Sequence, residues 1–194
     1  MFPVFAASLL LSCSTLLGAG GESISPPFDL SWGARRTEIE DLVTKANLQP
    51  PRKETVEGKE IWTVQGFDQP GLTAVLFYFS EGSLTEVELQ YGDAAWNLAR
   101  YGEFISQIKQ DLDLKYGRAQ VLSHTREPEK DVSQTVVAYR WQQPEQALDL
   151  VFYSAEREPQ AFRLLSLHYQ LVPAKKATEE PPDTGKVQKS AKKR

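Results

Sequence analysis

The chain has few of the residues that form disulfides, metal centres or nucleophilic catalytic sites. Its 194 residues include one cysteine and two histidines. A single cysteine excludes a disulfide within the chain, and a structural zinc site needs four cysteine or histidine-type ligands at close spacing. The Gly-x-Ser-x-Gly motif that marks the nucleophile of many hydrolases is also absent. We therefore expect a noncatalytic protein, without catalytic residues, metal ligands or a cofactor.

Both histidines have an ordinary structural interpretation. His124 precedes the highly charged segment 125–131, which indicates an exposed polar side chain. His168 alternates with Leu167 and Tyr169 in a strand-like run, so we expect it on the solvated face of that strand.

Basic residues are scarce in the body of the chain and concentrated after it. Residues 22–172 contain fifteen Lys/Arg and twenty-three Asp/Glu, whereas residues 173–194 contain seven and three. Surfaces that bind nucleic acid need clustered basic side chains to displace counterions from phosphates. The acidic body therefore argues against a nucleic-acid partner.

Charged side chains are absent from the first 17 residues, where an apolar run is followed by small residues at 18–21. This pattern is typical of a secretory targeting segment, here residues 1–21. The run is shorter than the roughly 20 apolar residues of a membrane-spanning helix. The sequence therefore predicts an exported protein.

The processing of this segment has alternatives that the sequence leaves open. Leu10-Leu11-Ser12-Cys13 resembles the bacterial lipobox, so Cys13 is a candidate lipidation site that would give a membrane-anchored lipoprotein. Cleavage near Ala19 or after Gly21 would instead release a soluble periplasmic or secreted protein. An uncleaved, cytoplasmic chain is the third alternative.

Residues 22–172 predict a single α+β domain. A helix is expected from Thr37, because Thr37 and Glu40 form a capping-box pattern and apolar residues follow at helical spacing. Asn47 and the prolines after it indicate the end of this helix. Strand-like runs follow at 60–65, 72–79 and 84–91, separated by segments rich in turn residues.

The same order of elements then repeats. A second amphipathic helix contains Tyr101, Ile105 and Leu112 and is closed by Gly117, and strands are expected at 135–142, 148–154 and 162–171. The pattern predicts tandem αβββ units at 28–91 and 96–171. These would form one antiparallel sheet of about six strands with two helices on one face. Chance similarity between short apolar strands is the alternative explanation of the repeat.

The segment Phe28-Asp29-Leu30-Ser31-Trp32-Gly33, followed by a capped helix and strands, resembles small envelope lipoproteins of the SmpA/OmlA/BamE type. The tandem helix-plus-three-strand order, with Leu114-Lys115-Tyr116-Gly117 closing the second helix, is similar to the beta-lactamase inhibitor protein family. The resemblance covers residues 28–169. It implies an envelope protein that binds other proteins through its sheet or helix edges, without chemistry.

The candidate partner-binding residues lie on two expected strands. Glu86, Glu88 and Gln90 share one strand face, with Val87, Leu89 and Tyr91 on the other. The strand 72–79 is apolar on both faces. If helices cover one face only, the other face exposes members of Leu72, Ala74, Leu76 and Tyr78, or else of Val75, Phe77 and Phe79. We expect Leu76 and Tyr78 to join the three residues Glu86, Glu88 and Gln90 in a partner-binding surface.

Two further features have a structural and a functional interpretation. Core packing is expected for at least three of the four tryptophans, Trp32, Trp62, Trp96 and Trp141, although exposed tryptophans often mark interfaces. Residues 173–194 have the composition of a disordered basic tail. The tail is either a solubilising segment or a contact to anionic lipid or cell-wall polymer.

Together these observations predict an exported noncatalytic envelope or secreted module that binds a protein partner through its sheet face. Membrane association would come from Cys13 or from the basic tail. A carrier of a lipid or other apolar ligand, held between helices and sheet, is the first alternative. An enzyme acting on an envelope substrate is the second.

Overall fold

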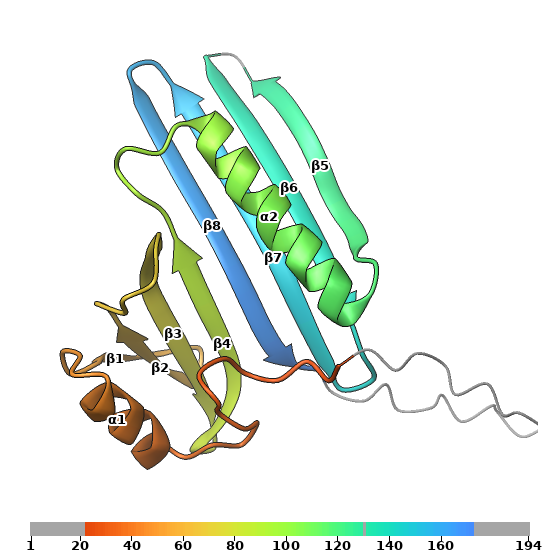
Figure 1. The fold of residues 1–194 in the computed structure, drawn as a ribbon. Helices are drawn as coiled ribbons and strands as arrows, with labels where there is room; N and C mark the ends of the chain where they lie inside the picture. Colours follow the sequence, from red (N-terminus) through yellow and green to blue (C-terminus); the bar gives the residue numbers. More distant parts are fainter. Residues whose placement is uncertain (1–21, 130, 173–194) are drawn as a thin grey trace, which may run out of the picture.

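A computed structural model of the chain describes residues 22–129 and 131–172. The expected targeting segment with Cys13 and the expected basic tail lie outside these residues. The described part is an α+β fold with one antiparallel sheet of eight strands and two helices (Figure 1). The elements, in chain order, are α1 (Arg36–Lys45), β1 (Arg52–Val56), β2 (Lys59–Val64), β3 (Leu72–Ser80), β4 (Ser83–Tyr91), α2 (Leu98–Tyr116), β5 (Gln120–Glu129), β6 (Val132–Gln142), β7 (Gln146–Arg157) and β8 (Gln160–Leu171).

Each half of the fold is one helix followed by a four-stranded meander. The strand order across the sheet is β1-β2-β3-β4-β8-β7-β6-β5, so the last strands of the two halves pair with each other. The α+β class, the single antiparallel sheet and the repeated order of elements agree with the sequence. The strand number does not, because each unit has four strands rather than three.

The two strands that the sequence analysis missed, β1 and β5, are the edges of the sheet. All five residues of β1 are exposed, and β5 carries Pro128 among polar and charged residues. An edge strand has one neighbour and here buries neither face fully, so it lacks the alternation of apolar and polar residues that reveals a strand.

The first helix begins two residues before the position expected from its sequence. Arg35 is its N-cap, and the backbone N–H of Arg35 donates to the Glu38 carboxylate at 2.8 Å. The Thr37–Glu40 capping box predicted from the sequence is therefore wrong. Ile39 and Val43 are buried against the sheet, and Asn47 has a left-handed backbone just after the helix.

The second helix agrees with its sequence pattern. Asn97 caps it by accepting a hydrogen bond from the N–H of Arg100, and Gly117 ends it with φ +85°. Tyr101, Ile105 and Leu112 are buried. Asp113 near the end of α2 accepts hydrogen bonds from the Trp141 indole and the Ala119 N–H. It thus fixes the end of the helix to β6 and to the start of β5.

Both helices cover the same face of the sheet, as predicted (Figure 1). The registers align the buried residues of successive strands on this face: Trp62, Phe77, Val87, Leu89, Leu165, Leu167, Leu150 and Phe152. The Tyr101 ring of α2 contacts the Phe152 ring with centroids 5.2 Å apart. Two of the four tryptophans, Trp62 and Trp141, belong to this core, and Trp96 packs against it.

An irregularity in β3 decides which of its apolar residues face the helices. The register shifts between Leu72 and Ala74, so Leu72 pairs with Tyr91 on the helix side, while Ala74 pairs with Gln90 on the opposite side. Ala74, Leu76 and Tyr78 therefore share the face away from the helices. Leu72, expected with them by simple alternation, faces the core because of the bulge.

The segment before α1 crosses the helix side of the sheet at one end (Figure 1). Ile24 is completely buried in the core, and its N–H donates to the Gln143 side chain at 2.9 Å. The Trp32 indole donates back to the Ile24 carbonyl at 3.1 Å. This segment closes the core between the two helices. In the described part of the chain, neither helix is long and apolar enough to cross a membrane.

Candidate interaction surface

The face of the sheet opposite α1 and α2, here called the open face, is the candidate functional surface. It consists of alternate residues of all eight strands. Among the described residues, no helix or strand lies over it, because both helices pack on the other side and every strand belongs to the one sheet. The expectation of one-sided coverage is therefore met within residues 22–129 and 131–172.

All five residues predicted to bind a partner lie on the open face. Leu76 and Tyr78 come from β3 and pair with Glu88 and Glu86 of β4, and Gln90 pairs with Ala74. The side chains of these five residues are half-buried by their neighbours. The sequence therefore placed them together correctly, although it did not reveal what each contacts.

Glu86 is at the centre of a charged cluster that joins the two halves of the fold. Its carboxylate lies 2.9 Å from His168 Nε2 of β8 and forms an ion pair with Lys59 of β2. The hydrogen bond with His168, together with Lys59, lowers the pKa of Glu86 to about 2, although burial acts in the opposite direction. His168 was expected to be a solvated strand residue, and its face is as predicted. Its carboxylate partner lies 82 positions away in the chain.

Tyr78 and Glu88 form a second polar pair beside this cluster. The Tyr78 hydroxyl donates to the Glu88 carboxylate at 2.8 Å, and the Gln90 amide donates to the other oxygen of Glu88 at 3.2 Å. Burial raises the pKa of the Tyr78 hydroxyl, and the nearby Glu88 and Glu86 carboxylates raise it further. Tyr78 therefore stays a neutral donor near pH 7.

A third polar cluster lies on the second half of the open face. Asp149 of β7 is 8% exposed and accepts two hydrogen bonds from the Arg140 guanidinium, at 2.7 and 2.6 Å. The amide of Gln170 donates to the same carboxylate at 3.0 Å. These bonds to Asp149 raise the pKa of Arg140. Two-point contacts of this kind fix the geometry of both side chains.

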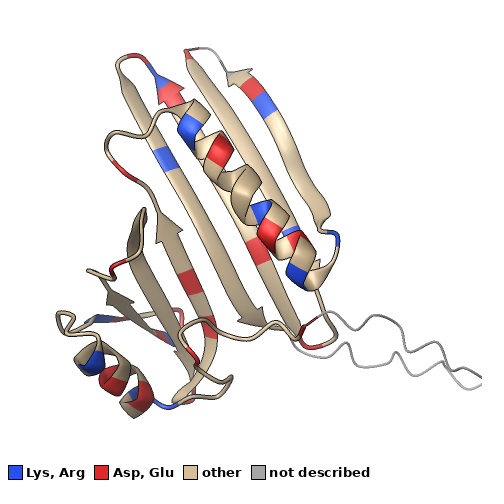
Figure 2. Cartoon of the chain, in the orientation of Figure 1, with Lys and Arg blue, Asp and Glu red and all other residues tan. Residues whose placement is uncertain are grey.

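The three polar clusters are continuous across the sheet. One register row runs through Thr63, Leu76, Glu88, His168, Asp149 and Arg140, from β2 to β6. Within this row His168 lies between two carboxylates, and a third, Glu86, is its hydrogen-bond partner. Acidic and basic residues are interspersed over the molecule rather than gathered by sign (Figure 2). The open face therefore presents mutually paired charges instead of a bare acidic surface.

Apolar side chains flank the polar row toward the ends of β6, β7 and β8. Val136, Tyr153 and Leu164 form one register row there and are half-buried. Phe162, which precedes Leu164 by two positions on the same face of β8, is 58% exposed. Its ring centroid lies 6.1 Å from that of Tyr153. This aromatic pair is the most exposed apolar feature of the open face.

Asp149, Arg140, Lys59 and Phe162 were not predicted from the sequence as members of this surface, and His168 was placed on the correct face without its partner Glu86. A polar residue inside the apolar run 147–152 was the available signal for Asp149, since an ionised side chain there needs a partner. The partner itself depends on strand pairing. The signal for Phe162 was absent because one aromatic residue at a strand end has no periodicity.

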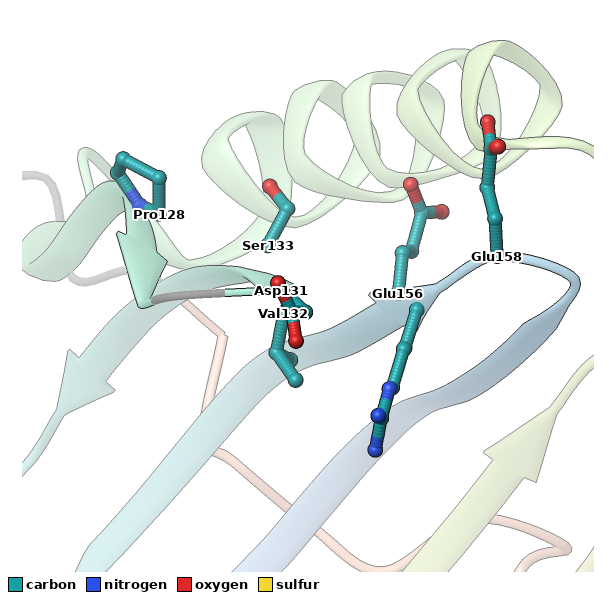
Figure 3. Close-up of a pocket in the computed structure, with 7 residues that line it drawn as sticks. Pro128, Asp131, Val132, Ser133, Glu156 and Glu158 are labelled. Atoms are coloured by element: carbon teal, nitrogen blue, oxygen red, sulfur yellow. The ribbon is translucent and has the colours of Figure 1, made fainter.

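The molecule also has hollows at the ends of strands and hairpins. One, of about 600 Å³, lies between the β5–β6 and β7–β8 hairpins and is lined by Pro128, Asp131, Val132, Ser133, Glu156, Arg157 and Glu158 (Figure 3). In Figure 3, Ser133, Glu156 and Glu158 point toward the side of α2. Glu156 is already an ion-pair partner of Arg163. The lining of the hollow therefore mixes acidic and basic side chains.

Two smaller hollows also lie at strand ends and are lined by polar and apolar side chains. One of about 460 Å³ lies around Ala155, Arg157 and Phe162, and one of about 300 Å³ around Arg52, Thr63 and Gln90. None of the three hollows lies between the helices and the sheet. No group of three or more metal-ligating side chains occurs in the described part of the chain.

Comparison of the chain with protein-family models, with curated proteins and with solved structures gives no match. The candidate function must therefore be argued from the geometry of the open face.

Proposed function

We propose that this protein is an exported noncatalytic module that binds a folded protein partner through the open face of its sheet. The observation that carries the proposal is that the helices cover one face of an eight-stranded sheet, while the opposite face carries ordered polar clusters beside an exposed aromatic pair. The apolar segment at the start of the chain supports export.

The size and shape of the open face favour a folded protein over a small ligand. Eight strands at about 4.8 Å spacing span roughly 38 Å, and the six strands of nine or more residues, β3 to β8, extend about 30 Å each. The resulting area, on the order of 1,000 Å², exceeds the about 800 Å² that each partner contributes to a typical stable interface. The hollows around this face lie at strand and hairpin ends, so its centre is suited to a broad protein surface.

The side chains of the open face are already ordered before a partner arrives. Asp149 and Glu86 each accept at least two hydrogen bonds or ion pairs from other strands, and Glu88 accepts one from Tyr78 of β3 and one from Gln90 of its own strand. Binding therefore costs little further side-chain entropy at these positions. The Tyr153–Phe162 pair supplies aromatic area, which carries much of the binding energy in many interfaces.

The proposal is tested with a matched pair of substitutions at exposed apolar residues. Phe162→Ala removes the aromatic side chain on the open face, and Leu114→Ala truncates a residue on the outer side of α2 that is 88% exposed. Photo-crosslinkers placed at Val136 and, as a control, at Glu103 on α2 would identify the partner in native cells. A purified partner should then bind Phe162→Ala at least tenfold more weakly than the unaltered chain.

Several results would contradict the proposal. Equal loss of affinity for both alanine variants would show that the open face is not the interface. Crosslinks from Val136 to a second copy of the chain alone, together with a dimer in solution, would assign the face to self-association. Native mass spectrometry that shows a bound lipid in the freshly purified protein would favour the carrier alternative.

A further inference from the structure

Exposed large apolar side chains gather at the junction between α2 and β5. Leu114, Val121 and Leu122 are 88%, 59% and 45% exposed, and they lie within nine residues of each other in the sequence. They are three of the five exposed large apolar residues in the part of the chain that the structure describes. The other two, Val56 and Phe162, lie on other strands, so the concentration at this junction is local.

Basic side chains are interspersed with these apolar residues. Lys115 is in the last turn of α2 and Arg118 in the loop that follows, and both are exposed. Arg118 has no hydrogen bond or ion pair with the described residues. Lys115 lies 3.3 Å from Glu22, in a pair whose two side chains are both largely solvated. Such a pair is worth at most about 1 kcal/mol and leaves Lys115 available to another anion.

Both ends of the described chain lie at this same end of the sheet. Ser23 donates to Gln146 at 3.1 Å, and the N–H of Val172 donates to the Glu145 carbonyl at 2.9 Å. These contacts bring residues 22–24 and residue 172 to the β6–β7 turn, and Figure 1 shows both ends beside the last turn of α2. The uncharged apolar segment and the 173–194 segment, with seven basic and three acidic residues, therefore attach at this junction.

We propose that this end of the domain, formed by residues 114–122 and the two chain ends, docks on a membrane surface that contains anionic lipid. Leu114, Val121 and Leu122 would enter the headgroup region while Lys115 and Arg118 contact lipid phosphates. Glu22 and Glu145 also lie at this end, and they offset the charges of Lys115 and Arg118 in the described part. The sequence that continues from residue 172 is basic, with seven basic and three acidic residues. This inference is independent of the protein partner: the strands lead away from the docked end, which leaves the open face accessible.

A single fluorescent label tests the docking geometry in the full chain. Cys13 is the only cysteine, so Cys13→Ser with Leu122→Cys gives one site for a polarity-sensitive fluorophore. The matched control is Phe162→Cys in the same Cys13→Ser background. The probes are vesicles of phosphatidylcholine, with or without phosphatidylserine. We expect the emission of the label at position 122 to shift to the blue with phosphatidylserine vesicles and to return when salt is raised, while the label at position 162 stays unchanged.

The control separates surface docking from insertion of the N-terminal segment alone. If the chain sediments with the vesicles but the label at position 122 does not shift, the chain is held by its terminal segments only and the proposal is overturned. Equal shifts at both positions would overturn it too. Leu114→Cys serves as a second site if Leu122→Cys fails to fold.

The contribution of the basic residues is measured separately by co-sedimentation. Lys115→Gln with Arg118→Gln should weaken binding to phosphatidylserine vesicles about five-fold for each charge removed. Lys45→Gln with Arg52→Gln, two exposed basic residues of the first half, should leave it unchanged. If both pairs of substitutions weaken binding equally, the effect is a nonspecific effect of charge. If neither pair weakens binding, Lys115 and Arg118 do not belong to the docking surface.

Discussion

Glu86 of β4 and His168 of β8 lie 2.9 Å apart across the junction between the two halves of the sheet. Within residues 22–129 and 131–172, β4 and β8 form the only direct strand pairing between the two meanders. The contact therefore joins the two halves on the open face. On the covered face, the halves are joined by the common core that contains residues of both helices and Ile24.

The lowered pKa of Glu86 predicts a specific loss of stability in acid. Because its pKa is about 2 in the folded chain and about 4.5 when unfolded, the ionised carboxylate stabilises the fold above pH 4.5, and this contribution disappears as the pH falls toward 2. Its size is on the order of 2 kcal/mol. Urea unfolding between pH 7 and pH 2 should show a smaller loss for Glu86→Gln than for the unaltered chain. Parallel curves for the two proteins would contradict the prediction.

The buried carboxylate of Asp149 should be more costly to remove alone than together with its partner. Asp149→Ala leaves Arg140 without its two-point acceptor, and we expect a loss of about 2–4 kcal/mol in the free energy of unfolding. Asp149→Leu with Arg140→Met replaces the pair by apolar side chains and should cost less than Asp149→Ala. A double-mutant cycle by chemical denaturation measures this coupling. Additive losses would show that the pair is not coupled.

Two glycines with the same backbone conformation should tolerate alanine very differently. Gly71 and Gly58 have φ of +77° and +81°, but an added Cβ at Gly71 would lie 2.5 Å from the Trp96 ring, whereas at Gly58 nothing lies within 4 Å. Gly58→Ala should cost about 1–2 kcal/mol for the left-handed conformation alone. Gly71→Ala should cost about 1–3 kcal/mol more, because Trp96 must move. Thermal unfolding compares the two, and similar losses would show that Trp96 yields freely.

The segment before α1 should contribute to the stability of the whole domain. Ile24 is completely buried, so Ile24→Ala should lower the free energy of unfolding by about 2–4 kcal/mol. The neighbouring Ser23 is exposed, and Ser23→Ala should change it by less than about 0.5 kcal/mol. Denaturant titration of both variants checks this. A negligible loss for Ile24→Ala would mean that the segment is not part of the cooperative core.

Local sequence patterns were sufficient for much of the fold because they act over a few residues. The spacing of Tyr101, Ile105 and Leu112 predicted α2, and Gly117 predicted its end. Alternation predicted six strands and placed Glu86, Glu88 and Gln90 on one face. The edge strands β1 and β5 were missed, because a strand without a buried face has no such alternation. Leu72 was misplaced because a bulge, which depends on the paired strand, reverses the alternation.

The sequence by itself therefore determined the class of fold, the one-sided burial of the helices and, away from the edge strands and the bulge in β3, the residues that share a strand face. Only the tertiary structure decided that Glu86 meets His168, that Asp149 meets Arg140, and that Glu22 meets Lys115 in the last turn of α2. The physical reason is range: side-chain periodicity follows from the geometry of one helix or strand, whereas these contacts depend on which strands become neighbours and in what register. That choice is made by packing of the whole core.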